Sequence, residues 1–243
     1  MGTSITPLKD RALKYRLVSF DLDGTLVDTA AEIAESVHLT FDDFALVRRP
    51  QDEITLLIGK GTHELMSRLM QRLYAEQPGL QERLPFETVF AQFDHHYAVT
   101  AGQLGRPYPG CEDALERLRS AGVQLACVTN KEQRHAERVL AATGLARWFP
   151  TLIGGDTLPY KKPDPRVISG LLQGCGVTAA QAAHLGDSSI DVQTARSAGV
   201  AAWAVPYGYN AGVPIEQSTP DRLFASLPAV ADWALAGDST AAG

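Results

Sequence analysis

The sequence predicts an α/β fold in which a doubly wound, Rossmann-like core with a parallel sheet carries an inserted α-helical cap domain. Three observations lead to this expectation. Short apolar runs alternate with amphipathic stretches from residue 105 onward, which is typical of a parallel sheet with right-handed helical crossovers. Residues 30–104, after the first apolar run, show helical spacing and no convincing strand. Polar residues follow the apolar runs directly, as expected where strands deliver functional groups at their carboxyl ends.

Composition and charge narrow the class of protein. The 243 residues are 45% hydrophobic and 21% charged, which is ordinary for a globular protein. The net charge of -6 argues against a nucleic-acid partner, because nucleic-acid binding needs a basic surface. No run approaches the roughly 20 apolar residues of a membrane span, and three widely spaced cysteines fit a reducing compartment. We therefore expect a cytoplasmic protein without a membrane or nucleic-acid partner; the sequence specifies no oligomeric state.

The first predicted strand, 17–20, ends in two aspartates one residue apart. Asp21 and Asp23 are followed at once by Gly24 and Thr25. Alternate residues of an extended chain point the same way, so the two carboxylates can converge on one spot. Like charges this close are costly unless a cation or a proton lies between them, and Gly24 permits a tight turn. This stretch therefore predicts a metal-ion site.

The segment 30–104 is predicted to form several helices. Thr29 and Glu32 have the spacing of a capping box at the start of the first one. Apolar residues at helical spacing predict helices over 33–44, 65–73 and 86–97, with a short apolar turn or helix at 54–58. The segment 59–62, Gly-Lys-Gly-Thr, opens the second long helix, and a helix N-terminus attracts anions. We expect Lys60 to direct a positive charge at a substrate carboxylate there; the alternative is a solvated residue at the helix start.

The rest of the chain alternates helices and strands. Strands are predicted at 123–128, 151–153, 183–185 and 201–205, and helices at 111–121, 132–143, 167–175, 191–198 and 227–235. The predicted core comprises residues 12–29 and 105–235, and the predicted cap comprises 30–104. Residues 1–11 and 236–243 are expected to be loose tails.

Functional side chains follow the predicted strands at their carboxyl ends. Thr129 and Asn130 follow the second strand, Lys162 lies in the loop after the third, and Asp187 and Asp191 follow the fourth. Because carboxyl ends of parallel strands share one edge, these residues can meet the aspartates of the first strand. A hard cation such as Mg²⁺ takes oxygen ligands, and a lysine among carboxylates requires a further anion. The sequence therefore predicts a site for Mg²⁺ and a phosphate group.

These polar segments resemble the four motifs of the haloacid dehalogenase superfamily. They are 21–25 (Asp-Leu-Asp-Gly-Thr), 128–130 (Val-Thr-Asn), 162–165 (Lys-Pro-Asp-Pro) and 186–191 (Gly-Asp-Ser-Ser-Ile-Asp), in that family's order. The helical segment lies where the family places its C1 cap. The segments 58–61, 154–156, 161–163 and 207–210 are similar to those of bacterial phosphoglycolate phosphatases. The resemblance implies a Mg²⁺-dependent phosphomonoesterase that hydrolyses 2-phosphoglycolate, or a similar small phosphate ester, through an aspartyl-phosphate.

The resemblance also implies a role for each site residue. Asp21 would be the nucleophile, and Asp23 would protonate the leaving oxygen and later deprotonate water. Mg²⁺ would be held by the carboxylates of Asp21 and Asp187 and by the backbone carbonyl of Asp23. Phosphate contacts are expected from Thr129, Lys162, Asn130 and the backbone near Leu22 and Gly24. Asp191 would orient Lys162 or metal-bound water.

Two other functions stay open. A phosphomutase of the β-phosphoglucomutase kind shares the helical cap and the aspartyl-phosphate, although the segments after the third strand and in the final loop favour the phosphatase. A receiver-type signalling module uses a similar carboxylate cluster, Mg²⁺ and lysine to accept a phosphoryl group. The large insert and Asp23 argue against such a module, because they add substrate enclosure and protonation of a leaving group.

Overall fold

A six-stranded sheet forms the centre of the protein. The computed structural model describes residues 13–236, so the predicted tails lie outside the described residues apart from Ala236. The strands are β1 (Leu17–Phe20), β4 (Gln124–Val128), β5 (Thr151–Ile153), β6 (Ala182–Gly186), β7 (Ala201–Ala204) and β8 (Arg222–Leu223). Their order is β5-β4-β1-β6-β7-β8, and every neighbouring pair is parallel. The chain winds outward from β1 in both directions, which confirms the predicted doubly wound class.

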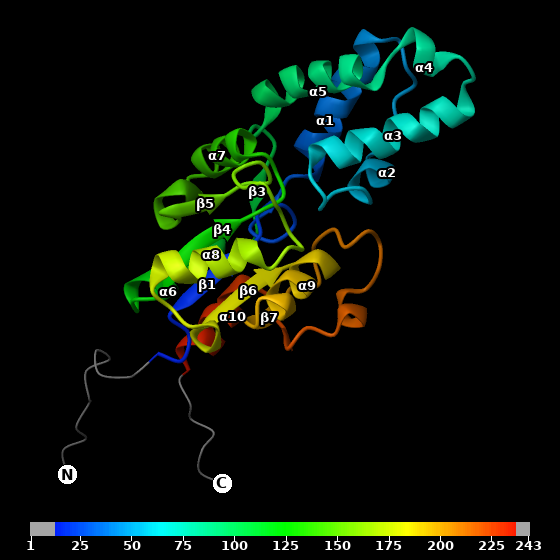
Figure 1. Ribbon diagram of the computed structural model, residues 1–243. Helices are drawn as coiled ribbons and strands as arrows, with labels where there is room; N and C mark the ends of the chain where they lie inside the picture. The colour runs from blue at the N-terminus through cyan, green and yellow to red at the C-terminus, as the bar shows by residue number, and fades with distance from the viewer. Residues whose placement is uncertain (1–12, 237–243) are drawn as a thin grey trace, which may run out of the picture.

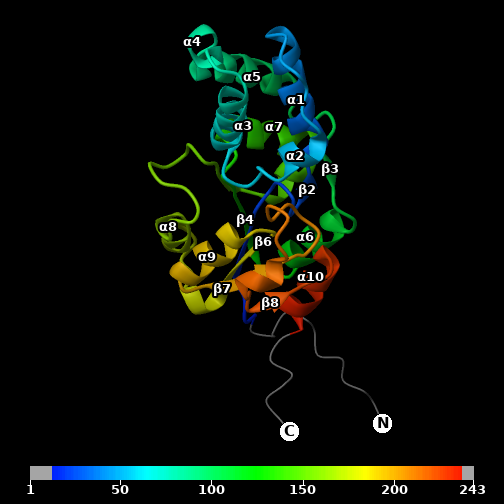
Figure 2. The same ribbon diagram turned by 90° about the vertical axis from the view of Figure 1, so that its right-hand side faces the viewer.

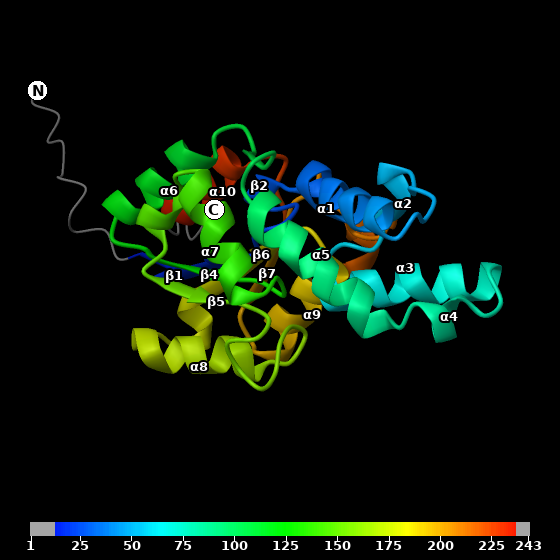
Figure 3. The same cartoon turned by 90° about the horizontal axis from the view of Figure 1, so that it is seen from above.

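Two sets of helices cover the two faces of the sheet. Val18 and Phe20 of β1 belong to the core beneath α6 (Cys111–Ser120), α7 (Gln133–Ala142) and α10 (Leu227–Leu235). Leu17 packs on the opposite face, beneath α8 (Arg166–Cys175) and α9 (Ser189–Ser197). Figure 3 shows α8 on one side of the sheet and α6 with α10 on the other. Burial on both faces explains why the strands appear in the sequence as continuous apolar runs.

Five helices stand beyond the carboxyl ends of the strands (Figures 1 and 2). They are α1 (Ala30–Asp43), α2 (Gln51–Thr55), α3 (Thr62–Glu76), α4 (Leu80–Arg83) and α5 (Phe86–Thr100); short 3₁₀ turns elsewhere are η2 (Leu145–Trp148), η3 (Ala179–Gln181) and η4 (Ile215–Ser218). α5 packs against both α1 and α3. The buried residues of α3 include Leu65, Leu69 and Leu73, at the predicted helical spacing. Within residues 13–236, no helix combines the length and the apolar character needed to cross a membrane.

A pair of two-residue strands joins the helical segment to the sheet. β2 (Val27–Asp28) leads into it, β3 (Arg106–Pro107) leads out, and the two pair antiparallel. The sequence did not predict this pair or β8, because two residues are too few to show an alternating pattern. The pairing holds both ends of the helical segment beside the loop that carries Asp21 and Asp23.

The capping box predicted at Thr29 and Glu32 is wrong. The Thr29 hydroxyl donates to Asp23 Oδ1 at 2.6 Å instead of to the helix backbone. Glu32 is fully buried and accepts from the backbone N–H groups of Gly102 at 2.8 Å and Gly105 at 2.9 Å. Thr29 and Glu32 thus bind partners outside α1, and Glu32 links α1 to the chain that returns from α5.

Candidate active site

Five polar side chains meet at the carboxyl edge of the sheet. Asp21 follows β1, Thr129 follows β4, Lys162 lies between β5 and α8, Asp187 follows β6, and Asp191 lies in the first turn of α9. All five are buried. The edge lies where the strand order reverses around β1, which is where open α/β sheets bind ligands. The structure therefore places together the residues that the sequence predicted to meet.

Lys162 is the cation at the centre of this cluster. Its ammonium lies 2.8 Å from Asp21 Oδ1 and 2.7 Å from Asp191 Oδ1, and the residue is only 3% exposed. Burial alone lowers the pKa of Lys162, but the attraction of Asp191 and Asp21 outweighs burial and raises the pKa above its usual value. Lys162 is therefore a permanent positive charge beside Asp21.

Asp191 is fully engaged by neighbouring donors. Its Oδ1 contacts Lys162 Nζ and His184 Nε2, and its Oδ2 accepts from the N–H and the hydroxyl of Ser188. Burial raises the pKa of Asp191, but the attraction of Lys162 and the contact with His184 outweigh burial and hold the pKa well below its usual range. Asp191 therefore positions Lys162 and has little capacity left for another ligand.

Asp187 approaches the backbone very closely. Its Oδ1 accepts from the Thr25 hydroxyl at 3.0 Å and its Oδ2 from the Tyr209 N–H at 2.6 Å. A Cβ at Gly24 would lie 2.4 Å from Asp187 Oδ2, and one at Gly208 would lie 2.1 Å from it. Glycine is therefore required at both positions. Each carboxylate oxygen accepts one hydrogen bond, which leaves lone pairs for a further partner.

The carboxylates of this cluster carry more negative charge than Lys162 neutralises. Burial raises the pKa of Asp21 to about 6, even though Lys162 acts in the opposite direction. Burial and repulsion from Asp21 raise the pKa of Asp187 well above its usual value. Either protons or a second cation must therefore accompany these groups at neutral pH.

The donor set fits Mg²⁺. Carboxylate oxygens of Asp21, Asp187 and Asp191 all lie within 4.8 Å of one another. Hard divalent cations prefer such oxygen ligands and complete their shell with water and substrate phosphate. Because Asp191 is engaged by Lys162, His184 and Ser188, Asp21 and Asp187 are the carboxylates available to a metal ion.

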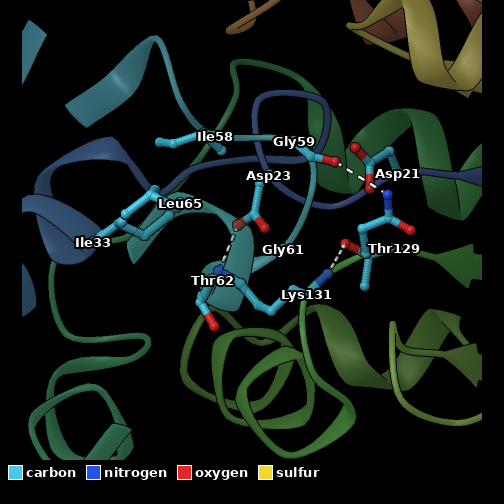
Figure 4. Close-up of a pocket in the computed structure, with 11 residues that line it drawn as sticks. Asp21, Asp23, Ile33, Ile58, Gly59, Gly61, Thr62, Leu65, Thr129 and Lys131 are labelled. Carbon is cyan, nitrogen blue, oxygen red and sulfur yellow. Dashed lines mark hydrogen bonds and ion pairs between the residues drawn. The ribbon is translucent and has the colours of Figure 1, made fainter. Parts of the chain in front are cut away.

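Asp23 faces the helical segment rather than the carboxylate cluster. Lys131 Nζ lies 2.7 Å from Asp23 Oδ1, the oxygen that also accepts from Thr29 (Figure 4). A pocket opens beside this pair, lined by Asp21, Asp23, Ile33, Ile58, Gly59, Gly61, Thr62, Leu65, Thr129, Asn130 and Lys131. The two aspartates thus share one pocket but have different cations beside them, Lys162 at Asp21 and Lys131 at Asp23.

Comparison with known proteins decides the family, since the profile of haloacid dehalogenase-like hydrolases matches residues 18–205. The chain belongs to this family. A phosphoglycolate phosphatase from Aliivibrio fischeri is 39% identical over 206 residues, which cover 85% of this chain and 90% of the relative. Another from Haemophilus influenzae is 34% identical over 211 residues, which cover 87% and 94%. A solved structure of a predicted phosphoglycolate phosphatase from Haemophilus somnus is 33% identical with a TM-score of 0.84, covering 89% of this chain and 96% of its own.

Asn130 and Thr129 of this hydrolase lie at the carboxyl end of β4, as predicted, and each makes hydrogen bonds there. The Asn130 side-chain amide donates to the carbonyls of Gly59 at 3.2 Å and Lys162 at 3.0 Å, which links the helical segment to the lysine loop. The Thr129 hydroxyl accepts from the Lys131 N–H at 3.2 Å. Both residues line the pocket beside Asp21 and Asp23.

Three other predicted binding residues have less direct access to the pocket. The Gly24 N–H donates to the Val27 carbonyl at 2.9 Å and is therefore used within the turn. The Leu22 side chain is fully buried and does not line the pocket, so the backbone contact predicted for Leu22 stays a prediction. Lys60 is exposed and lines a neighbouring hollow with Glu64 and Lys161, not the pocket of Asp21 and Asp23.

Sequence reasoning missed Lys131 and the true role of Thr29. Both contact Asp23 Oδ1, one through an ion pair and one through a hydrogen bond. Lys131 directly follows Thr129 and Asn130 at the carboxyl end of a strand, so its position in the chain was the available signal. For Thr29 the local capping pattern pointed to the wrong partner.

Proposed function

We propose that this hydrolase is a Mg²⁺-dependent phosphomonoesterase that converts 2-phosphoglycolate, or a similar small phosphate ester, to the alcohol and phosphate. The observation that carries the proposal is the buried cluster of Asp21, Lys162 and Asp187 beside a pocket that also contains Asp23. The relatives named phosphoglycolate phosphatase match nearly the whole chain and support this substrate class.

In the proposed reaction, Asp21 attacks phosphorus in line and displaces the ester oxygen, giving an aspartyl-phosphate. Asp23 gives its proton to the departing oxygen and then removes a proton from the water that attacks phosphorus. Lys162 and the Thr129 hydroxyl hold phosphate oxygens, and Lys162 also offsets the negative charge of the transition state. Mg²⁺, held by Asp21, Asp187 and the Asp23 carbonyl, would supply further positive charge to the phosphate oxygens. The second step releases phosphate and restores the Asp21 carboxylate.

Phosphate release from a panel of esters tests this function. We expect Mg²⁺-dependent turnover of p-nitrophenyl phosphate and 2-phosphoglycolate, and loss of turnover in EDTA. Conversion of a sugar 1-phosphate to its 6-phosphate without release would favour the phosphomutase. Stable phosphorylation without turnover of any ester would favour the signalling module.

The three cysteines Cys111, Cys127 and Cys175 form no disulfide. Free thiols are typical of a reducing compartment, and we therefore place the reaction in the cytoplasm.

Mg²⁺ is expected to raise the melting temperature, and to do so more at pH 8 than at pH 5. The pKa of Asp21 is raised to about 6, so in the metal-free protein its protonated form stabilises the fold at low pH, and this contribution is lost as pH rises through about 6. Mg²⁺ competes with these protons. At ten times its Kd we expect an increase of about 3–6 °C at pH 8, measured by differential scanning fluorimetry.

Two variants make the Mg²⁺ experiment specific. Asp187→Asn should remove most of the increase, whereas Asp164→Asn, at a partly exposed aspartate paired with Arg166, should retain it. An equal increase at both pH values, or in Asp187→Asn, would show that the ion binds elsewhere.

Lys60→Met is expected to raise KM for an anionic ester by about two- to fivefold at low salt, with little change in kcat. An exposed lysine near the lysine loop attracts anions over a distance, and salt screens such attraction. Kinetics at low salt and in about 0.5 M NaCl check this expectation. An effect that persists at high salt would indicate direct contact with substrate, and an unchanged KM at low salt would remove Lys60 from substrate recognition.

A further inference from the structure

Lys131 is a buried charge to which the proposed reaction assigns no task. It follows β4 directly and is only 2% exposed. Its ammonium pairs with Asp23 Oδ1 at 2.7 Å and donates to the Tyr97 hydroxyl of α5. Lysines are almost never this buried unless they are paired, so the position is held by specific contacts.

The ammonium of Lys131 keeps one hydrogen-bonding position for a ligand. A lysine carries three N–H donors. The contacts with Asp23 and Tyr97 use two of them, and no other acceptor for Lys131 Nζ occurs among residues 13–236. Lys131 can therefore bind a third partner without releasing Asp23.

An anion bound in the pocket beside Lys131 would meet few other positive groups. Lys131 is the one cationic side chain among the residues that line it. The N-terminus of α3 adds a second positive element, because Gly61 and Thr62 line the pocket and the glycine at the N-cap has no side chain to cap the first backbone N–H groups. In Figure 4, the Lys131 side chain extends to Asp23 beside Thr62, so its ammonium and the N-terminus of α3 both border the pocket.

Because Lys131 lies beside Asp23, the part of the substrate next to the leaving oxygen is the part that can contact Lys131. Under the proposed function, Asp23 protonates the oxygen that leaves phosphorus. In 2-phosphoglycolate a single methylene carbon separates that oxygen from the carboxylate. An anionic group so close to the oxygen at Asp23 lies within reach of the ammonium that touches Asp23.

We propose that Lys131, together with the N-terminal end of α3, binds the carboxylate of the substrate and so selects small phosphorylated acids over neutral phosphate esters. This inference rests on the proposed phosphatase function and names its specificity determinant. Ile33, Ile58 and Leu65 form the apolar wall around the intervening carbon.

Two esters of the same length test the proposal: 2-phosphoglycolate, with a carboxylate, and 2-hydroxyethyl phosphate, with a neutral hydroxyl. The wild-type enzyme with Mg²⁺ should prefer the carboxylate ester by about 10- to 100-fold in kcat/KM, the effect of one hydrogen bond between charged groups. Lys131→Met should lose most of this preference, chiefly through a higher KM for 2-phosphoglycolate. Lys131→Arg should retain part of it. Arg83→Met, which removes an exposed cation of α4 that lines neither hollow, should change neither ester by more than about twofold.

The outcomes separate the possible failures. Equal losses on both esters in Lys131→Met would show that Lys131 acts through Asp23 alone and would overturn the proposal. So would a wild-type enzyme without preference for the carboxylate, a result that needs no variant to fold. If the wild type hydrolyses neither ester nor p-nitrophenyl phosphate, the phosphatase function itself fails, and the specificity proposal fails with it. Thermal melting of each variant confirms that kinetic differences are measured on folded protein.

Discussion

Asp21→Asn is expected to reduce turnover by at least about 10³-fold while leaving the protein folded. An amide nitrogen or oxygen cannot replace the carboxylate as a nucleophile toward phosphorus, and loss of a nucleophile commonly costs an enzyme several orders of magnitude. Phosphate release from 2-phosphoglycolate and p-nitrophenyl phosphate measures the effect. Acid quenching followed by mass spectrometry should find a phosphoryl group on the peptide that contains Asp21 in the wild type, and none in the variant.

The same substitution should not destabilise the metal-free protein at pH 8. The pKa of Asp21 is raised to about 6, chiefly by burial, so ionisation of Asp21 opposes folding above that pH. Asparagine has no charge to bury. The melting temperature of Asp21→Asn in EDTA should therefore equal or exceed that of the wild type at pH 8, with a smaller difference at pH 5.

A matched control is Asp232→Asn, which removes a surface aspartate paired with Arg117 and should leave turnover unchanged. Turnover above about one tenth of wild type in Asp21→Asn would rule out a covalent route through this residue. A collapse of the folded state in the variant would instead show that the Asp21 carboxylate is needed for structure.

Lys162→Met is expected to abolish activity and also to destabilise the fold. The substitution leaves Asp21 and Asp191 buried without the ammonium that lies within 2.8 Å of both. Removing one partner of a buried ion pair typically costs about 3–5 kcal/mol, which corresponds to a fall in melting temperature of about 6–12 °C or more for a chain of this size. Activity should fall by at least about 10³-fold, because Asp21 also loses the cation that supports its ionised form.

The destabilisation of Lys162→Met should depend on pH in a defined direction. Lys162 holds the pKa of Asp191 well below its unfolded value of 3.8, so this pairing stabilises the fold above about pH 4 and is lost as pH falls. The difference in melting temperature between wild type and Lys162→Met should thus be largest near neutral pH and shrink below pH 4. Lys161→Met, at the adjacent exposed lysine, should match the wild type at every pH. A Lys162→Met protein with unchanged melting temperature would contradict the proposed electrostatic role of the ion pairs.

The sequence alone determined the α/β class, most helices and the set of residues at the sheet edge. The strand 151–153 and the helix 227–235 appear in the structure with the predicted bounds, as β5 and α10. Apolar runs buried on both faces and helical spacing are local patterns, and parallel pairing then forces the carboxyl ends to one edge. For that reason the sequence suffices to predict that Asp21, Lys162 and Asp187 meet.

Contacts between distant segments were decided only by the tertiary structure. β2 pairs with β3 across the entire helical segment, and Glu32 accepts from Gly102 and Gly105 rather than capping its own helix. Such partners leave no periodic pattern in the sequence, because their choice depends on how the helical segment packs onto the sheet. Local capping signals fail when another acceptor competes for the same side chain, as Asp23 does for the Thr29 hydroxyl.

The candidate site also combines features that the sequence determined with features that only the tertiary structure decided. The residues around Asp21 follow from strand ends, whereas the surroundings of Asp23 follow from strand ends only in part. Lys131 follows β4 and meets Asp23 after the neighbouring β1, but its contact with Tyr97 of α5 depends on how the helical segment packs. The sequence thus determined which polar residues gather at the sheet edge, because parallel strands fix their positions. Tertiary packing decided the contact between Lys131 and Tyr97, because it joins residues from two separate parts of the chain.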